Sequence, residues 1–391
     1  MPSVCPTPAT DGNKHRNFNL LRCLAVEHEI TLVCPVDPRQ GDDLSELKAL
    51  GVDVRGCPAR HPGGRVRALL RRRPSCTVPG CLDDMACAVG PDERFDVAFG
   101  ALSVAPALHA TGLPVVMDEH NVERDAYRRL FFLEPLSVRK LARGLDWLEV
   151  GAFERRWLRR ANHVTCCSER DRQILKQIAG RVPVTVVDNG VDPELVTFDD
   201  GPGTDDLVVF VGGMGYAPNA DAARVLIEQV MPALRRRRPG ARLKIVGKDP
   251  SAELLAAQSD DVEVTGKVAD VGPYLRSAAV TVMPLRTGGG TRLKVLEAMA
   301  AGTPIVATKI AIEGLELVDR RDVRVGRPAE LAGMAAELMA DPDLRAGQAR
   351  AARATVEARY AWSDIVRRLE KVLEEVAAGS PATPRKDRGE P

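Results

Sequence analysis

The sequence predicts an α/β protein built from two doubly wound domains. The chain has 391 residues, which is too long for one ordinary hydrophobic core and fits two domains. Short apolar runs that are typical of buried parallel strands alternate with amphipathic helices along both halves. In the second half, two such strands run directly into glycine-rich turns, at residues 212–215 and 288–290. A strand, a glycine turn and a helix in that order begin a βαβ unit.

The strand and helix patterns divide the chain near residue 200. We predict a first domain over residues 1–199, a polar linker over 200–206, a second domain over 207–360, a last helix over 361–377 and a disordered tail over 378–391. The predicted strands of the first domain are 30–34, 52–55, 95–99, 115–118, 163–167 and 184–187, and its helices are 16–25, 44–50, 65–73 and 124–160. The second domain has predicted strands beginning at 207, 243, 262, 279 and 304, with helices at 222–237, 271–277, 291–302, 328–339 and 342–360.

Composition narrows the functional class. The formal net charge is +1, so there is no global electrostatic case for nucleic-acid binding. No apolar run approaches the length of a membrane-spanning helix, and residues 1–19 lack the apolar segment of a signal peptide. The nine cysteines are an odd number without metal-ligand spacing. We interpret them as reduced thiols of a cytoplasmic protein, and we expect no metal site.

Residues 284–308 carry the clearest chemical pattern. Gly288, Gly289 and Gly290 follow a buried strand and precede a helix that starts at Thr291 or Arg292. Glycines let backbone N–H groups approach a phosphate closely, and the helix dipole favours negative charge at that end. Two cations at this helix start suit a diphosphate. A carboxylate one and a half turns further along can accept hydrogen bonds from both hydroxyls of a ribose, so the pattern predicts a nucleotide-diphosphate ligand. These residues are Arg292, Lys294 and Glu297.

The turn after the first strand of the second domain is a further phosphate-binding candidate. It contains Gly212, Gly213 and Met214, and we expect Asn219 and Asp221 to cap the following helix. Lys248 follows the next strand, from where its ammonium can face a nucleotide.

The segment Glu119-His120-Asn121-Val122-Glu123 is a second chemical site. It follows the strand 115–118 directly, and open α/β sheets place ligands at the carboxyl ends of their strands. A lone histidine is more often structural than catalytic, but its position at a strand end before a polar helix start favours a role in a site.

These motifs resemble the GT-B glycosyltransferases of the family-4, or group 1, type. The string GGGTRLKVLEAMA is similar to a subgroup in which glycines and a lysine replace the first of two family glutamates: Glu297 matches the second, and the first falls on Gly289. The segment at His120 is similar to the family's HNVE motif. The resemblance implies two Rossmann-like domains that face a cleft, and a hexosyltransferase-like enzyme.

The family further implies transfer of a sugar from a nucleotide-diphosphate sugar to the hydroxyl of a saccharide or lipid-linked acceptor, with retention of configuration and without a metal or other cofactor. Capsule, exopolysaccharide or glycolipid synthesis is the implied setting. In this interpretation His120 contacts the transferred sugar, Arg292, Lys294 and Glu297 are catalytic, and nucleic acid is not a partner. Further contacts implied for donor or acceptor come from Gly12, Asn13, Lys267 and Val268.

Three expectations remain open from the sequence. Two functions are alternatives to sugar transfer. The chain could be a catalytically silent sugar-nucleotide-binding partner of another transferase, or a GT-B-type sugar-nucleotide epimerase. The run Arg71-Arg72-Arg73 is either a solvated helix face or a peripheral contact with anionic lipid at the inner face of a membrane. Only residues 3–5 remain of the first strand, so we expect either a natural start upstream of Met1 or a loose first half.

Overall fold

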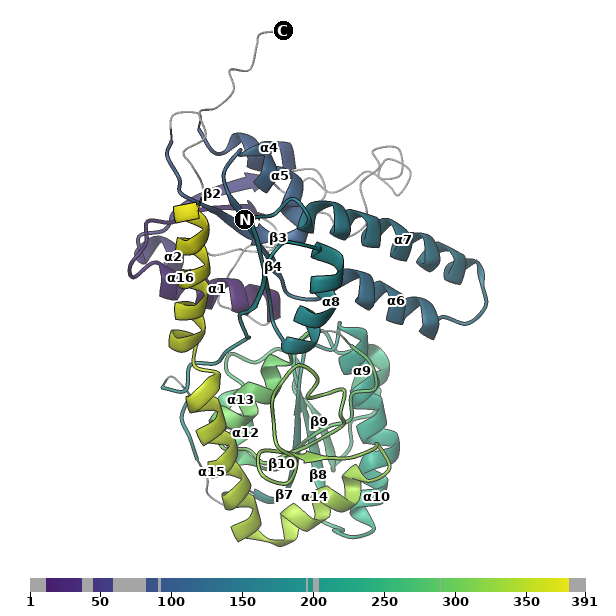
Figure 1. Cartoon of the computed structure of the whole chain (residues 1–391). Helices are drawn as coiled ribbons and strands as arrows, with labels where there is room; N and C mark the ends of the chain where they lie inside the picture. Colours follow the sequence, from purple (N-terminus) through teal and green to yellow (C-terminus); the bar gives the residue numbers. More distant parts are fainter. Residues whose placement is uncertain are drawn as a thin grey trace. The chain divides into compact units, whose positions relative to one another are not determined.

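The protein was studied as a computed structural model, which describes residues 12–36, 45–58, 82–90, 93–194, 196–199, 204–288 and 290–379 (Figure 1). The described residues form two compact units. Unit 1 comprises those of Met1–Asp188 and Val366–Pro391, and unit 2 is Asn189–Ile365. The predicted first strand, the basic run at 71–73 and the tail beyond 379 lie outside the described residues.

Unit 1 contains a parallel sheet with the strand order β3-β4-β5-β6. Its strands are β3 (Ala98–Ala101), β4 (Val115–Glu119), β5 (His163–Cys166) and β6 (Val184–Val186). All five residues of β4 are buried. The helices around this sheet are α4 (Leu82–Cys87), the short 3-10 helix η2 (Leu102–Val104), α5 (Ala105–Ala110) and α8 (Glu169–Ala179).

A second parallel pair, β1 (Thr31–Val36) with β2 (Asp53–Pro58), belongs to the same unit. The helices α1 (Gly12–Leu24) and α2 (Ser45–Ala49) accompany this pair. Phe18 and Leu24 of α1 are buried, as their helical spacing predicts. Gly12 and Asn13 were predicted to lie in a loop, but they form the first turn of α1. A helix tolerates glycine there because its first N–H groups need no partner within the helix.

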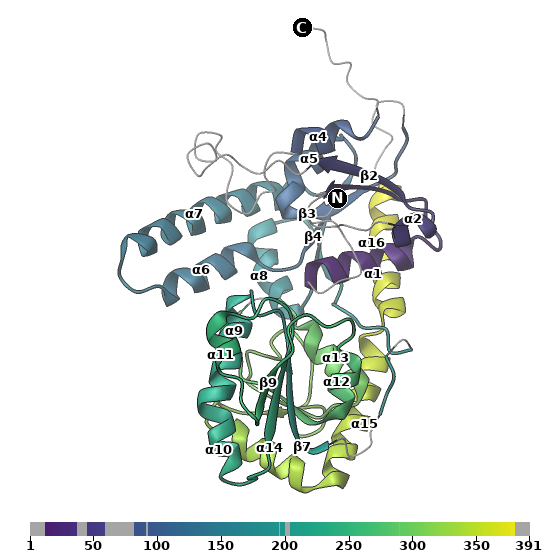
Figure 2. The ribbon, with the colours of Figure 1, turned by 180° about the vertical axis from the view of Figure 1, so that it is seen from behind.

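The predicted single helix over 124–160 is wrong, because the chain forms a hairpin of two helices. These are α6 (Glu123–Leu133) and α7 (Val138–Leu158). Pro135 explains the break, since proline disfavours helical geometry in the residue before it. Ser137 then caps α7 by accepting a hydrogen bond from the Lys140 backbone N–H at 3.3 Å. Figures 1 and 2 show α6 and α7 side by side, extending away from the sheet of unit 1.

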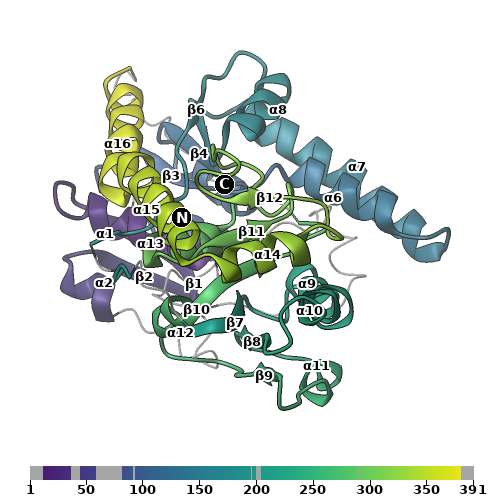
Figure 3. The same ribbon diagram turned by 90° about the horizontal axis from the view of Figure 1, so that it is seen from below.

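Unit 2 is a doubly wound domain around a six-stranded parallel sheet. The strand order is β12-β11-β10-β7-β8-β9, which can be followed in Figure 3. Figures 1 and 2 show α9 and α10 on one side of this sheet and α12 and α13 on the other. The strands are β7 (Thr204–Val211), β8 (Arg242–Val246), β9 (Val262–Val264), β10 (Ala278–Met283), β11 (Ile305–Ala307) and β12 (Arg324–Val325). The helices are α9 (Ala217–Val225), α10 (Met231–Arg235), α11 (Ala252–Ala256), α12 (Gly272–Ser277), α13 (Leu293–Ala301), α14 (Leu331–Ala340) and α15 (Pro342–Arg359), with a π-helical segment η3 (Leu226–Val230) between α9 and α10.

Two element starts differ from the prediction. The strand β7 begins at Thr204, inside the predicted linker. The helix α9 begins at Ala217 with Pro218 in its first turn, five residues before the predicted start at Ala222. A proline at the start of a helix has its backbone already in helical geometry and lacks only an N–H that would be unpaired there. Asn219 and Asp221 therefore lie within the helix and do not cap it.

The chain passes between the units at residues 188–189 and 365–366. Val191 forms two hydrogen bonds with the segment between α15 and the last helix: its N–H donates to the Tyr360 carbonyl at 2.9 Å, and its carbonyl accepts from the Trp362 N–H at 3.2 Å. The described residues between 189 and 199, predicted to belong to the first domain, lie in unit 2. The last helix, α16 (Trp362–Gly379), continues into unit 1, where Val372 and Val376 pack on Val116 of β4. Among the described residues, no helix is long and apolar enough to cross a membrane.

Candidate functional site

The first candidate site lies at the topological switch point of unit 2. The strand β7 is the first of this sheet in the chain, and its successors lie on opposite sides of it: β8 on one side and β10 on the other. Open α/β sheets bind ligands outside the carboxyl ends of the two strands at such a point. The glycine turns at 212–215 and 288–290 follow β7 and β10 respectively, so both lie at the carboxyl ends of these strands.

Backbone hydrogen bonds tie the turn after β7 to the turn after β8. Gly212 donates to the Val246 carbonyl at 2.9 Å, and Met214 donates to the Lys248 carbonyl at 2.8 Å. Gly247 has a φ of +152°, and a Cβ there would lie 1.8 Å from the carbonyl oxygen of Gly212. Only glycine allows this close approach of two chain segments.

A side-chain hydrogen bond joins the helices that follow the two glycine turns. Nζ of Lys294, on α13, donates to Oδ1 of Asn219, on α9, at 2.6 Å. The amide nitrogen of Asn219 donates to the Gly213 carbonyl at 2.9 Å. Asn219 therefore bridges the lysine to the first turn, a role that the predicted cap did not include. Gly212 leaves the room for this, since a Cβ there would meet Lys294 Nζ at 2.7 Å.

The ammonium of Lys294 has an unusual electrostatic environment. Burial and the neighbouring Arg292 lower its pKa to about 7, against the opposing effect of Glu297. The Lys294 nitrogen also lies 4.8 Å from the centre of the Phe210 ring. An anion bound beside this group would favour its charged form. The arrangement is therefore suited to accepting negative charge.

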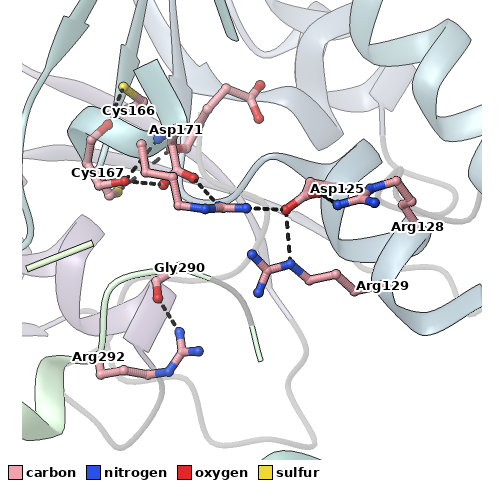
Figure 4. Close-up of polar contacts among 11 residues, drawn as sticks. Asp125, Arg128, Arg129, Cys166, Cys167, Asp171, Gly290 and Arg292 are labelled. Atoms are coloured by element: carbon pink, nitrogen blue, oxygen red, sulfur yellow. Dashed lines mark hydrogen bonds and ion pairs between the residues drawn. The ribbon is translucent and has the colours of Figure 1, made fainter. Parts of the chain in front are cut away.

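Arg292 is the N-cap residue of α13, and its side chain is buried. Its guanidinium donates to the Gly290 carbonyl, as Figure 4 shows. Gly288 has a φ of +130°, and a Cβ there would meet the guanidinium at 2.7 Å. The predicted helix end is confirmed, because Gly302 terminates α13 in the left-handed conformation with a φ of 83°.

The remaining residues predicted for this site also lie near the carboxyl ends of the strands of unit 2. Glu297 lies on α13 one turn after Lys294 and is half-buried, as is Thr291. The stem of Lys248 passes 3.7 Å from the Cβ position of Gly213. Val268 is half-buried and Lys267 is exposed after β9. Gly289 lies outside the described residues.

The second candidate site surrounds His120 in unit 1. Nε2 of His120 lies 2.9 Å from Oδ2 of Asp118, the fourth residue of β4. The Asp118 carboxylate accepts from Arg16 Nε at 3.1 Å, from its terminal nitrogen at 3.0 Å, and from the Thr165 hydroxyl at 2.7 Å. Burial alone would raise the pKa of Asp118, but Arg16 and His120 outweigh it and hold the pKa well below its usual range. Nε2 of His120 is thus close to a permanent carboxylate, although the two atoms are not aligned for a hydrogen bond.

Buried acids support the loop that carries His120. Oε1 of Glu154, on α7, accepts from the Arg124 backbone N–H at 3.4 Å at the start of α6. Burial raises the pKa of Glu154 to about 7 despite this bond, and burial also raises the pKa of Glu119 well above its usual value. Asp125 anchors the same helix: Arg128 and Arg129 reach it in Figure 4, and Arg170 of α8 reaches it at 2.6 Å.

Two family models match the chain, one on each side of residue 200. "Glycosyltransferase Family 4" matches residues 14–195, and "Glycosyl transferases group 1" matches residues 205–341. The chain belongs to the group 1, family-4 glycosyltransferases. The finer subgroup with the GGGTRLKVLEAMA string stays a prediction.

Curated relatives of this glycosyltransferase include three mycobacterial enzymes. A glycogen synthase from Mycobacterium tuberculosis is 27% identical over 228 residues, which cover 54% of this chain and 53% of the relative. A GDP-mannose-dependent alpha-(1-6)-phosphatidylinositol monomannoside mannosyltransferase from the same organism is 33% identical over 160 residues, which cover 37% of this chain and 42% of the relative. A phosphatidyl-myo-inositol mannosyltransferase from Mycolicibacterium smegmatis is 31% identical, covering 49% and 52%. The matched part thus spans about half the length of these relatives.

Solved structures establish the fold over nearly the whole chain. HepE from Anabaena, in complex with UDP and glucose, matches with a TM-score of 0.68 at 18% identity, covering 96% of this chain and 98% of the other. A sucrose-phosphate synthase from Thermosynechococcus elongatus matches with a TM-score of 0.72 at 17% identity, covering 97% and 98%. The predicted GT-B fold with two Rossmann-like domains is confirmed.

The sequence did not predict two side-chain interactions, that of Asn219 with Lys294 and that of Arg16 with Asp118. Asn219 was interpreted as a helix cap, although Pro218 beside it was the stronger helix-start signal. Arg16 was placed on a helix without a role. The signal that could have found its partner is Asp118, since a carboxylate inside a buried strand requires a compensating donor.

Proposed function

We propose that this protein transfers a sugar from a nucleotide-diphosphate sugar to an acceptor hydroxyl. The observation that carries the proposal is the pair of glycine turns at the switch point of unit 2, joined through Lys294 and Asn219. A helix N-terminus and the cations Arg292 and Lys294 lie at this end of the sheet, which is the chemistry that a diphosphate requires. Family membership supports the same reaction class.

In the proposed reaction, the glycosidic bond to the diphosphate breaks as the acceptor oxygen bonds to the sugar. The nucleoside diphosphate leaves with the electron pair, and its leaving phosphate oxygen takes up the proton of the acceptor hydroxyl. Arg292 and Lys294 stabilise its charge, and Glu297 accepts hydrogen bonds from the ribose hydroxyls. Lys248, Lys267 and Val268 border the nucleotide. We propose retention of configuration and no metal requirement, as the family resemblance implies.

We assign His120 to the transferred sugar through Nδ1. The Asp118 carboxylate lies 2.9 Å from the other ring nitrogen, which favours a charged imidazolium at this position when a ligand binds. Gly12 and Asn13, in the first turn of α1, remain candidates for the acceptor side.

The acceptor is a saccharide or a lipid-linked molecule. The relatives carry the names of a glycogen synthase and of phosphatidylinositol-type mannosyltransferases, and these names support both classes equally. We propose glycan, exopolysaccharide or glycolipid synthesis as the setting.

A donor screen followed by a transfer assay tests the proposal. Nucleoside diphosphates and their common sugars are added to the whole protein, and its melting temperature is recorded. A ligand at 100 times its Kd stabilises a protein by about 2.7 kcal/mol, so a true donor raises the melting temperature visibly. The best donor is then supplied with saccharide and lipid acceptors, and the transferred sugar is measured.

Each outcome separates the proposal from its rivals. Transfer to an acceptor supports it. Binding without turnover with any acceptor indicates a silent binding partner, and conversion of the free nucleotide sugar without acceptor indicates an epimerase. No stabilisation by any nucleotide contradicts the proposal.

A further inference from the structure

Exposed apolar side chains gather on the α6–α7 hairpin. Large hydrophobic residues that are exposed elsewhere in the described part of the chain are scattered singly, which is ordinary. On the hairpin, seven of them lie between residues 130 and 148. The members of this group are Leu130, Phe132, Leu136, Val138, Leu141, Leu145 and Leu148.

The α7 members of this group form a regular stripe: Val138, Leu141, Leu145 and Leu148. Their exposed fractions are 84%, 72%, 64% and 66%. Spacings of three, four and three residues place them on one face of the helix. We call this set the α7 stripe.

A neighbouring face of α7 packs against α6. The rings of Phe131 and Trp147 lie 5.7 Å apart, and the Lys140 ammonium lies 5.2 Å from the centre of the Phe131 ring. A Cβ at Gly144 would meet the Phe131 ring at 3.2 Å. The hairpin therefore has its own small core, and the α7 stripe faces away from it.

Positive charge accompanies the exposed stripe. Residues 123–160 contain ten arginines and lysines against six aspartates and glutamates, although the whole chain carries only +1. Two of the six acids, Glu123 and Glu154, have pKa values raised by burial. Arg155 and Arg156 are exposed and lie on the same face as the stripe, which they share with one exposed acid, Glu149, seven residues before Arg156.

We propose that α7 docks on an anionic lipid surface. The α7 stripe enters the boundary between headgroups and acyl chains, and Arg155 and Arg156 contact lipid phosphates. An amphipathic helix with leucines on one face and arginines that reach the headgroups binds membranes in this manner. Anionic headgroups complement the positive excess of the hairpin. The inference does not depend on the proposed sugar transfer, because it concerns a surface in unit 1 and needs no donor.

A second copy of the chain would be the other apolar occupant of such a stripe. A coiled-coil seam requires this spacing over three to four heptads, whereas the α7 stripe spans residues 138–148 and then gives way to arginines. The charge excess also opposes the approach of an identical hairpin. A lipid surface satisfies both the apolar and the cationic part of the face.

Co-sedimentation of the whole protein with vesicles tests the proposal. One vesicle type contains phosphatidylcholine alone, and the other also contains phosphatidylglycerol. We expect binding to the anionic vesicles that weakens as salt is raised, since salt screens the arginine contacts. The triple variant L141Q/L145Q/L148Q and the double variant R155Q/R156Q should each lower the bound fraction, with an apparent partition coefficient reduced about tenfold or more.

Matched variants in unit 2 serve as controls. L255Q/V318Q changes two exposed apolar side chains, and R236Q/R237Q changes two adjacent exposed arginines. Both should bind anionic vesicles as the parent does. All substituted side chains are exposed, so circular dichroism should show that every variant folds.

Three results would overturn the proposal. The first is a parent protein that does not sediment with anionic vesicles, and the second is hairpin variants that bind as the controls do. The third is a dimer in sedimentation velocity that L141Q/L145Q/L148Q abolishes, in a protein that does not bind vesicles; this result would assign the stripe to a second copy.

Discussion

Arg16 and Asp118, 102 positions apart in the chain, form a buried two-point ion pair. Arg16 donates two hydrogen bonds to the carboxylate and a third, at 2.8 Å, to the Asp188 carbonyl. The pair therefore fixes α1 to β4 and to the segment at which the chain leaves unit 1. Asp118 in turn contacts His120, so the same carboxylate serves both the fold and the candidate site.

We predict that Arg16→Met destabilises the protein by about 3–5 kcal/mol, because it leaves the Asp118 charge buried without its partner. Asp118→Asn should destabilise on the same scale. The pKa of Asp118 is depressed in the folded state from its usual 3.8, so its contribution is present above about pH 4 and is lost as pH falls further. Urea denaturation at pH 7 and at about pH 2.5 measures both effects. Arg143→Met, at a half-buried arginine of α7, is the control. A parent-like midpoint for Arg16→Met would contradict the role of the pair.

This pair also marks the limit of what the sequence predicts. The end of α13 at Gly302 and the turn at 288–290 were predictable because glycine, helical spacing and strand composition are local signals. The position of His120 at a strand end was predictable for the same reason. The partners Arg16–Asp118 and Lys294–Asn219 were not, since they depend on which strands become neighbours in a sheet. The break at Pro135 carried a local signal, but the strong helical pattern on both sides of it dominated the prediction.

We predict that nucleotide binding weakens above pH 7 because of Lys294. Its pKa of about 7 in the free protein means that it is charged below that pH and loses its proton above it. A bound diphosphate favours the charged form, so binding above pH 7 takes up a proton and the affinity falls by up to about tenfold per pH unit. Lys294→Met should remove this dependence, whereas Lys309→Met, at an exposed lysine, should retain it. Calorimetry at pH 6.5 and 8.5, in buffers of different ionisation enthalpy, measures affinity and proton uptake. If nucleotide affinity falls with pH equally in the parent and in Lys294→Met, the lysine is not the titrating group.

We predict that Glu297→Ala weakens binding of the best nucleotide by about 1–3 kcal/mol, the scale for losing a charged hydrogen-bond partner. Loss of the carboxylate removes the proposed acceptor for the ribose hydroxyls. The parent should bind the matching 2′-deoxynucleotide more weakly than the nucleotide itself. The variant should bind the two with nearly equal affinity. Calorimetry compares the four pairs. Unchanged affinity for every nucleotide that binds the parent would exclude the ribose role.

We predict that Arg292→Ala lowers sugar transfer by about 10²-fold or more, the scale for removing one preorganised electrostatic partner. Arg292 is buried, so the melting temperature of the variant is measured first to establish that it is folded. Transfer by the parent should persist in chelator. Activity that disappears in chelator and returns with magnesium would contradict the proposed metal-free reaction.

The last prediction concerns the backbone contact between the turns after β7 and β8. Gly247→Ala places a Cβ 1.8 Å from the Gly212 carbonyl oxygen, at a φ of +152° that side chains rarely adopt. Neither segment can yield easily, because Gly212 and Met214 are hydrogen-bonded to residues on either side of Gly247. We expect a loss of stability of at least about 2 kcal/mol from strain and displacement. The Gly212 turn should also move away from Lys294, so nucleotide affinity should fall in whatever fraction remains folded. Gly347→Ala is the control: that glycine lies exposed within α15, no atom lies within 4 Å of its Cβ position, and alanine there should stabilise by about 0.5–1 kcal/mol. Thermal and urea denaturation of the two variants, with nucleotide calorimetry, give the comparison. A Gly247→Ala protein that melts and binds as the parent does would show that this close approach does not hold the two turns together.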